Sequence, residues 1–219
     1  MNAQVITLYR EGKFDNALPL AERVLTIREK SLGPDHLLVA TALRNLAELL
    51  SANGKRREAA STYRRFLTTY EKAAGGNDPK IAEALDRYVC LLVGSGEREE
   101  ALEVQERLYK LENGFDYDES AKRAGKKLAA GGLMVGKLIS SPPPSYPAEA
   151  KHARIAGPVV MKITVDEAGR VASVKTLCGH PLLAKASEES ISRASYAPTV
   201  VAGKPVKVVG VAIYNFVIQ

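Results

Sequence analysis

The amino-acid sequence predicts an all-α array of helical hairpins, followed by a small α+β domain with the order helix, strand, strand, helix, strand. Two observations predict this division of the 219 residues. The first half repeats its own pattern with a long period, which is typical of stacked helical hairpins. The last third alternates apolar and polar residues, which indicates strands with one buried face. A run of three prolines, residues 142–144, precedes the second pattern.

Identical residues recur every 42 positions in the first half. The recurring residues are Gly12, Gly54 and Gly96, then Ala17, Ala59 and Ala101, then Arg23, Arg65 and Arg107. Each unit is expected to contain a helix that ends at the glycine, a tight turn and a second helix, as in residues 39–53 and 57–73. The alanine is small because the two helices cross there at close range. One hairpin cannot cover its own apolar face, so neighbouring hairpins stack.

Units of this kind resemble tetratricopeptide repeats. The 42-residue period and the phrase EKSLGPDH, residues 29–36, resemble the longer variety found in kinesin light chains, over residues 1–113. In such arrays the first helices line a concave groove whose exposed positions contact ligands. The positions implied for this groove are Thr41, Arg44, Glu48, Glu83 and Asp86. Two interpretations stay open: a peptide groove of mixed charge, or solvated residues on a structural spacer.

The last third is expected to begin with a short helix and to end with a long strand. Pro147 suits the first turn of a helix, and the residues from Asp166 to Gly169 suit the turn of a hairpin. In chain order, the expected elements are a helix over residues 148–154, strands over residues 159–166 and 171–178, a helix over residues 182–194 and a strand over residues 206–218.

This order of elements, with the motifs SYPAEA, DEAGR, GHPLL and YAP, resembles the C-terminal domain of TonB over residues 134–219. TonB is the periplasmic protein that passes inner-membrane energy to outer-membrane transporters. In that family a transporter segment binds as an added β-strand along the last strand of the domain, close to a Tyr-Pro pair. The partner-strand site that the resemblance implies consists of Tyr146, Pro147, Val208, Val209, Val211, Ile213, Tyr214 and Asn215.

The last strand also has the composition of a strand that pairs with a partner. Apolar side chains occupy both of its faces, Val211 is expected at an exposed position, and no proline or charge interrupts residues 208–218. An uninterrupted edge strand is prone to aggregate unless another strand pairs with it. An added strand would satisfy its open backbone groups. The alternative is that this strand is central in its sheet or covered by the repeat domain.

We expect a repeat domain over residues 1–130, a linker rich in glycine and proline over residues 131–145, and a TonB C-terminal-like domain over residues 146–219. A helix over residues 119–129 would cap the last hairpin. Residues 133–139 fit either a short strand or plain linker. The repeat register places Met1 inside a helix, so we expect a preceding segment that carries a signal peptide or an anchor.

The sequence contains no pattern of residues that indicates catalysis. The three histidines do not lie at metal-ligand spacing from Cys, Asp or Glu, and the motifs of phosphate-binding loops and serine hydrolases are missing. We therefore expect no catalytic residue, metal, cofactor or small-molecule substrate. The formal charge of +6 is spread over a mixed surface without Trp, which disfavours nucleic acid. Cys90 and Cys178 are expected to be small buried thiols, because a disulfide would have to join the two domains.

Two function classes stay open. The first is a non-enzymatic, TonB-like adapter in the periplasm or cell envelope of a Gram-negative-type bacterium. It would capture a TonB-dependent outer-membrane receptor by strand addition and bind a second protein through its repeats. The second is an envelope scaffold that kept the TonB-like fold as a protein-binding module without energy transduction. The last strand could also pair with a second copy of the chain to form a homodimer.

The prolines and the glycine pair at residues 131–132 predict a protease-sensitive connection. Limited proteolysis should cleave between residues 131 and 146 and release one helical piece and one mixed piece, both folded. Mass spectrometry of the fragments identifies the cleaved bond. A single protected fragment would show instead that the two halves share a core.

Overall fold

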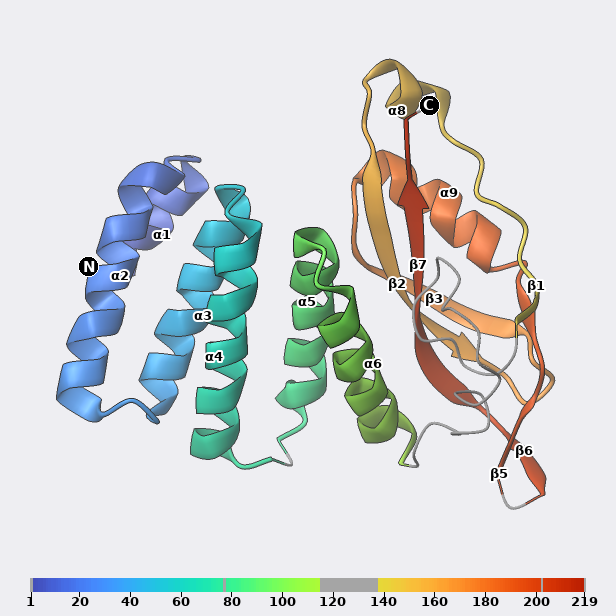
Figure 1. Cartoon of the computed structure of the whole chain (residues 1–219), viewed down its shortest axis with the longest axis horizontal. Helices are drawn as coiled ribbons and strands as arrows, with labels where there is room; N and C mark the ends of the chain where they lie inside the picture. The colour runs from blue at the N-terminus through green and yellow to red at the C-terminus, as the bar shows by residue number, and fades with distance from the viewer. Residues whose placement is uncertain (1, 77, 115–137, 202, 219) are drawn as a thin grey trace. The chain divides into compact units, whose positions relative to one another are not determined.

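The computed structural model of the chain describes residues 2–76, 78–114, 138–201 and 203–218 (Figure 1). The chain forms two compact units, residues 1–98 and residues 99–219. The first unit is helical and the second contains the strands, so the predicted fold class is confirmed. No helix in the described ranges is long and apolar enough to cross a membrane.

The first unit consists of helices that each pack against the next helix in the chain (Figure 1). Its helices are α1 (Asn2–Arg10), α2 (Phe14–Leu32), α3 (Leu37–Ala52), α4 (Arg56–Ala74) and α5 (Lys80–Ser95). The turns that follow α1, α3 and α5 contain Gly12, Gly54 and Gly96, with φ angles of 70°, 76° and 87°. Only glycine adopts this conformation readily, which explains why the repeat keeps glycine at this position.

The recurring alanines are buried where the helices meet, as the repeat predicts. Ala17 and Ala59 are 0% exposed. An aromatic group fills the space between α4 and α5, where the rings of Tyr63 and Tyr88 stack with their centroids 5.8 Å apart. The edge of Phe66 meets Tyr63 with a centroid distance of 4.8 Å. Small residues at the crossings and large residues between them therefore form the core of the first unit.

The second unit begins within helix α6 and ends with the longest strands. Its elements are α6 (Arg98–Asn113), β1 (Leu138–Ser140), α8 (Ala148–His152), β2 (Gly157–Val165), β3 (Val171–Cys178), α9 (Pro181–Ile191), β4 (Ser195–Tyr196), β5 (Thr199–Val201), β6 (Lys204–Val206) and β7 (Val208–Phe216). The expected helix, strand, strand, helix, strand order is present as α8, β2, β3, α9 and β7. The short strands β4, β5 and β6 were not expected from the sequence.

The main sheet is antiparallel with the order β3, β2, β7. Its register places Met161 opposite Ala212 and Thr164 opposite Val209. Among the described strands β7 pairs only with β2, so β7 lies at the edge of this sheet. The alternative that the last strand is central is therefore wrong.

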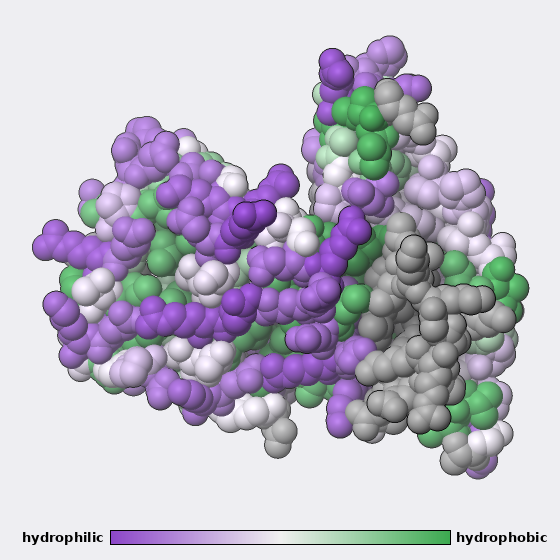
Figure 2. All heavy atoms as spheres, in the orientation of Figure 1, coloured by the Kyte–Doolittle hydropathy of each residue, from purple (hydrophilic) through white to green (hydrophobic). Residues whose placement is uncertain are grey.

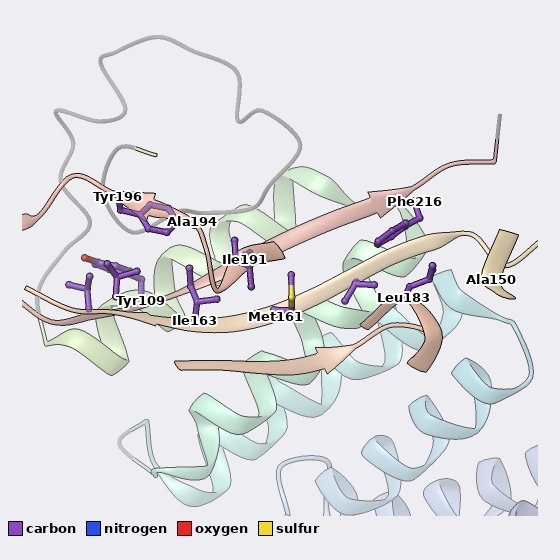
Figure 3. Close-up of a cluster of buried hydrophobic side chains, with 13 residues drawn as sticks. Tyr109, Ala150, Met161, Ile163, Leu183, Ile191, Ala194, Tyr196 and Phe216 are labelled. Atoms are coloured by element: carbon purple, nitrogen blue, oxygen red, sulfur yellow. The ribbon is translucent and has the colours of Figure 1, made fainter. Parts of the chain in front are cut away.

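The hydrophobic core of the second unit lies between one face of this sheet and α9 (Figure 3). Alternate residues of β2 enter this core, as their pattern predicts. The buried members are Tyr109, Ala150, Val159, Met161, Ile163, Val165, Leu183, Ile191, Ala194, Tyr196, Val208, Ala212 and Phe216. Tyr109 belongs to α6, so a helix that the sequence groups with the repeats contributes to this core.

The described part of the predicted linker is attached to the second unit. Strand β1 pairs with β4, with Leu138 opposite Tyr196. The carbonyl oxygen of Pro142 accepts a hydrogen bond from the hydroxyl of Ser190 in α9. The part of the predicted cleavage region that begins at Leu138 is therefore bonded to the folded unit. The predicted capping helix and the glycine pair lie outside the described residues, and the domain boundaries stay predictions.

The two cysteines differ from the expectation. Cys90 in α5 and Cys178 at the end of β3 are each disulfide-bonded, and neither is a free thiol. The expectation of two small thiols is therefore wrong, although Cys90 is buried as predicted. A buried free cysteine and a disulfide-bonded one look the same in sequence, because both suit an apolar position in a helix or a strand.

The turn between β2 and β3 depends on Gly169, which has a φ angle of 82°. A Cβ atom at this position would lie 1.9 Å from the carbonyl oxygen of Tyr196. The backbones are close because the amide of Tyr196 donates to the carbonyl of Gly169 at 2.8 Å. The Asp166 carboxylate accepts hydrogen bonds from the backbone amides of Arg170 and Ala168. These bonds, and above all the one from Arg170, lower the pKa of Asp166.

Gly169→Ala should lower the free energy of unfolding by about 2 kcal/mol or more, because it combines backbone strain with a clash against backbone. Gly203→Ala is the matched control. Gly203 has a φ angle of 79° but no atom within 4 Å of an added Cβ, so it should lose only about 1 kcal/mol. Urea unfolding of both variants measures the difference. Equal losses would show that the approach to Tyr196 adds no constraint.

Candidate protein-binding edge of the C-terminal sheet

Strand β7 presents one row of backbone groups that do not bond to β2. Residues of an antiparallel strand alternate between groups that bond the neighbouring strand and groups that point away from it. The amide and the carbonyl of Val209 both bond to a side chain of α6, so they point away from β2. By alternation, the backbone groups of Val211, Ile213 and Asn215 also point toward the free edge. This row is where another strand could pair.

The predicted site residues on β7 differ in exposure. Val208 is buried in the core, Val209, Ile213 and Tyr214 are half-buried, and Asn215 is exposed. Val211 is 3% exposed, so the expectation of an exposed position there is wrong. Gln105 and Leu108 of α6 lie beside Val211 around a gap of only 10 Å³. Among the described residues, α6 therefore covers the beginning of the edge, and none covers its end.

Tyr146 and Pro147 lie near the open end of β7, as the predicted site requires. The ring of Tyr146 meets the ring of Phe216 edge-on, with the centroids 5.4 Å apart. The Tyr146 hydroxyl donates a hydrogen bond of 2.6 Å to the carbonyl of Ile155, which holds the ring in place. Pro147 stands at the N-cap of α8. The structure thus brings together the Tyr-Pro pair and the end of the last strand.

The hydroxyl of Tyr214 connects the same region to α9. It lies 2.8 Å from the hydroxyl of Ser141 and 3.2 Å from the hydroxyl of Ser190. The side chain of Tyr214 packs against the core of the unit. Tyr214 is therefore a partly buried support of the strand, and its polar end is already occupied by serine hydroxyls.

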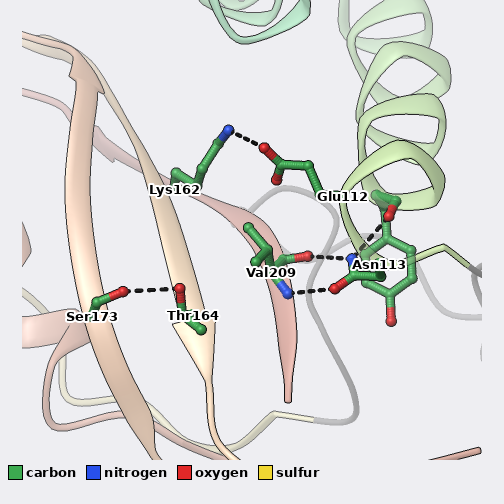
Figure 4. Close-up of polar contacts among 7 residues, drawn as sticks. Glu112, Asn113, Lys162, Thr164, Ser173 and Val209 are labelled. Atoms are coloured by element: carbon green, nitrogen blue, oxygen red, sulfur yellow. Dashed lines mark hydrogen bonds and ion pairs between the residues drawn. The ribbon is translucent and has the colours of Figure 1, made fainter. Parts of the chain in front are cut away.

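The sequence did not reveal the residues of α6 that contact the sheet (Figure 4). The side chain of Asn113 accepts from the amide of Val209 at 2.8 Å and donates to its carbonyl at 3.0 Å. Glu112 forms an ion pair of 2.5 Å with Lys162 of β2. An asparagine before Gly114 looks like an ordinary helix end in sequence. No local signal could have identified a partner so far away in the chain.

The predicted groove residues of the repeats have unequal surroundings. Burial, followed by the charge of Glu48, raises the pKa of Tyr63, and the charges of Arg44 and Glu83 also act on it. These charged groups therefore lie around one buried tyrosine. Thr41 donates to the carbonyl of Leu37 within its own helix.

Asp86 does not fit the expected pattern of exposed groove positions. It is 9% exposed and therefore buried, so its assignment to a solvated groove is wrong. The helical pattern placed Asp86 three residues after Glu83, on the same side of the helix. In the structure Glu83 is exposed and Asp86 is buried, a difference that sequence periodicity does not resolve.

A cavity of 440 Å³ opens beside Glu48 in the first unit. Apolar side chains of α1, α2 and α3 line most of it, and Arg10 and Asn45 add polar groups. Figure 2 shows that hydrophilic residues cover much of the visible face of the repeats. Across the described ranges, no group of His, Cys, Asp or Glu is arranged to hold a metal ion.

Two protein-family models match the chain. The tetratricopeptide repeat model matches residues 1–72. The model of the Gram-negative bacterial TonB protein C-terminal matches residues 142–218. The chain therefore carries tetratricopeptide repeats followed by a TonB C-terminal domain, and both predicted resemblances are confirmed. Modules of these two kinds indicate a role in protein–protein interaction.

Several solved structures are similar to parts of the chain. TPR-like repeats of a kinesin light chain from Podosopora anserina share 21% identity over 50% of this chain and 52% of that chain, with a TM-score of 0.44. BtubC (BKLC) from P. vanneervenii shares 21% identity over 54% of this chain and 48% of that chain, with a TM-score of 0.46. The TonB CTD of Pseudomonas aeruginosa shares 27% identity over 38% of this chain and 86% of that chain, with a TM-score of 0.33.

The chain spans about half the length of the kinesin-light-chain-like structures. No curated protein matches it in sequence.

The ion pair between Glu48 and Arg87 is expected to stabilise the repeats weakly. The Arg87 Nε atom lies 2.8 Å from the carboxylate of Glu48, and this bond is the main reason that the pKa of Arg87 is raised. Both side chains are about a third exposed. A double-mutant cycle of Glu48→Gln and Arg87→Met should give a coupling of about 1 kcal/mol or less, smaller in 1 M salt. A coupling unaffected by salt would contradict this account.

Proposed function

We propose that this chain is a non-enzymatic adapter of the Gram-negative cell envelope. It captures an extended segment of a partner protein by adding that segment as a strand to β7. The observation that carries the proposal is the free edge of β7 beside Tyr146, in a domain that matches the TonB C-terminal model. The preferred partner is a TonB-dependent outer-membrane receptor in the periplasm.

The physical case for strand addition rests on the backbone of β7. In the described chain, Ile213 and Asn215 make no hydrogen bond on the side away from β2. A partner strand would supply these bonds, and its side chains would alternate between the two faces of the sheet. On one face they would meet the aromatic pair of Tyr146 and Phe216. On the other face they would meet Ile213.

The repeats are proposed to bind a second protein. Arg44 and Glu83 are exposed and carry opposite charges on the predicted concave side. The cavity beside Glu48 provides apolar surface for a side chain of the partner. Tetratricopeptide arrays serve many unrelated partners, so this surface defines only a binding role. The adapter would thus join two envelope proteins.

The test replaces single backbone donors on the free edge. Ile213→Pro and Asn215→Pro each remove an amide that points away from β2, and proline is tolerated at such edge positions. Isothermal titration calorimetry would use peptides from the N-terminal segments of outer-membrane receptors. Each variant should bind about tenfold more weakly than the wild type, since one hydrogen bond is lost and the ring obstructs the partner strand. Tyr146→Ala should also weaken binding.

Ile213→Val is the matched control, because it keeps the amide and a β-branched side chain. Circular dichroism and thermal unfolding establish that each variant is folded. Wild-type affinity in both folded proline variants would show that β7 does not accept a strand. Binding by peptides of other envelope proteins, but by none from receptors, would favour the scaffold without energy transduction.

A further inference from the structure

The side chain of Asn113 makes the two hydrogen bonds that one residue of an added strand would make. Its amide oxygen accepts from the Val209 backbone amide at 2.8 Å, and its amide nitrogen donates to the Val209 carbonyl at 3.0 Å (Figure 4). A residue of an antiparallel partner exchanges this same pair of bonds with the residue opposite. At Val209, therefore, the edge of β7 already has a substitute for a partner strand.

Helix α6 holds Asn113 firmly in this position. The amide nitrogen of Asn113 also donates to the carbonyl of Tyr109 at 2.8 Å. Tyr109 is 4% exposed and belongs to the hydrophobic core of the unit. The ion pair of Glu112 with Lys162 is largely buried, with side chains 20% and 18% exposed. Removing α6 from the sheet would expose this core residue and break this ion pair, so a partner strand would not displace it easily.

The covered and open parts of the edge meet between Val211 and Ile213. Val211 is buried beside α6, whereas Ile213 is half-buried and Asn215 is exposed. Val217, just beyond the strand, is 65% exposed. Tyr146 borders this second part through its contact with Phe216. Within the part of the chain that the structure describes, the edge is therefore open from residue 213 to residue 217.

We propose that α6 acts as a built-in substitute strand that confines partner addition to residues 213–217. This inference rests on the proposed function and adds a limit to it. The segment that binds is then short, about five residues long, because each of its residues pairs with one residue of the open edge. It is an extended peptide with apolar side chains at alternate positions, since it meets the aromatic pair on one face and Ile213 on the other.

Amide hydrogen exchange of the free, full chain tests which part of the edge is open. By NMR, the Val209 amide should be protected, whereas the amides of Ile213 and Asn215 should exchange rapidly. Asn113→Ala should accelerate exchange at Val209 about tenfold or more, because the amide loses its acceptor. Exchange at Asn215 should not change.

Asn53→Ala, in the first unit, is the matched control, since Asn53 also follows the end of a helix and its side chain donates a hydrogen bond to Asp15 of the same unit. It should leave Val209 protected. An unprotected Val209 amide in the wild type, or protection that survives in folded Asn113→Ala, would overturn the inference. These outcomes do not depend on any partner peptide.

A second arm uses the receptor peptides from the calorimetry. A bound peptide should protect Ile213 and Asn215 and leave the side-chain amide resonances of Asn113 unchanged. Peptide binding should not depend on the Val209 amide. The affinity of Asn113→Ala for the peptide should therefore stay within about threefold of the wild type. A peptide that shifts Asn113 and takes over Val209 would overturn the confinement. If no peptide binds, the proposed function fails, and the free-protein exchange still decides the role of α6.

Discussion

The antiparallel pairing of β2 with β7 is the interaction on which the second unit depends. Its register places Met161 opposite Ala212 and Val165 opposite Val208, so the apolar side chains of both strands enter one core. A shift by one residue would turn all of these side chains to the other face. The same register directs the outer backbone groups of Val209 and its alternate neighbours away from the sheet. The core and the direction of the outer backbone groups are thus two consequences of one pairing.

Helix α6 limits that edge and completes the core at the same time. Tyr109 packs with the core residues, and Asn113, one turn further along, bonds the backbone of Val209. Edge strands expose unpaired backbone groups that favour aggregation, and natural proteins often cover part of them. Here a helix covers the beginning of the strand and leaves its end open beside Tyr146.

In the repeat unit, ion pairs connect neighbouring repeats. Glu29 bonds Arg65, Asp35 bonds Lys72, and Glu48 bonds Arg87, and each pair spans 36 to 39 positions in the chain. Two of these pairs join equivalent helices of successive repeats, α2 with α4 and α3 with α5, whereas Asp35 lies in the turn before α3. Exposed pairs of this kind stabilise little individually. Arg44 of α3 and Glu83 of α5 are exposed charged residues of the same unit.

The sequence alone determined the repeat and the order of the main elements, because both depend on local patterns. Glycine after each first helix, alanine at each helix crossing and alternation along β2 are constraints that neighbouring residues express directly. The tertiary structure decided which positions are accessible. Asn113 and Val209 are 96 positions apart, and Val211 is apolar whether buried or exposed. No local pattern encodes such a contact, because it depends on where the fold brings a helix end against a strand edge.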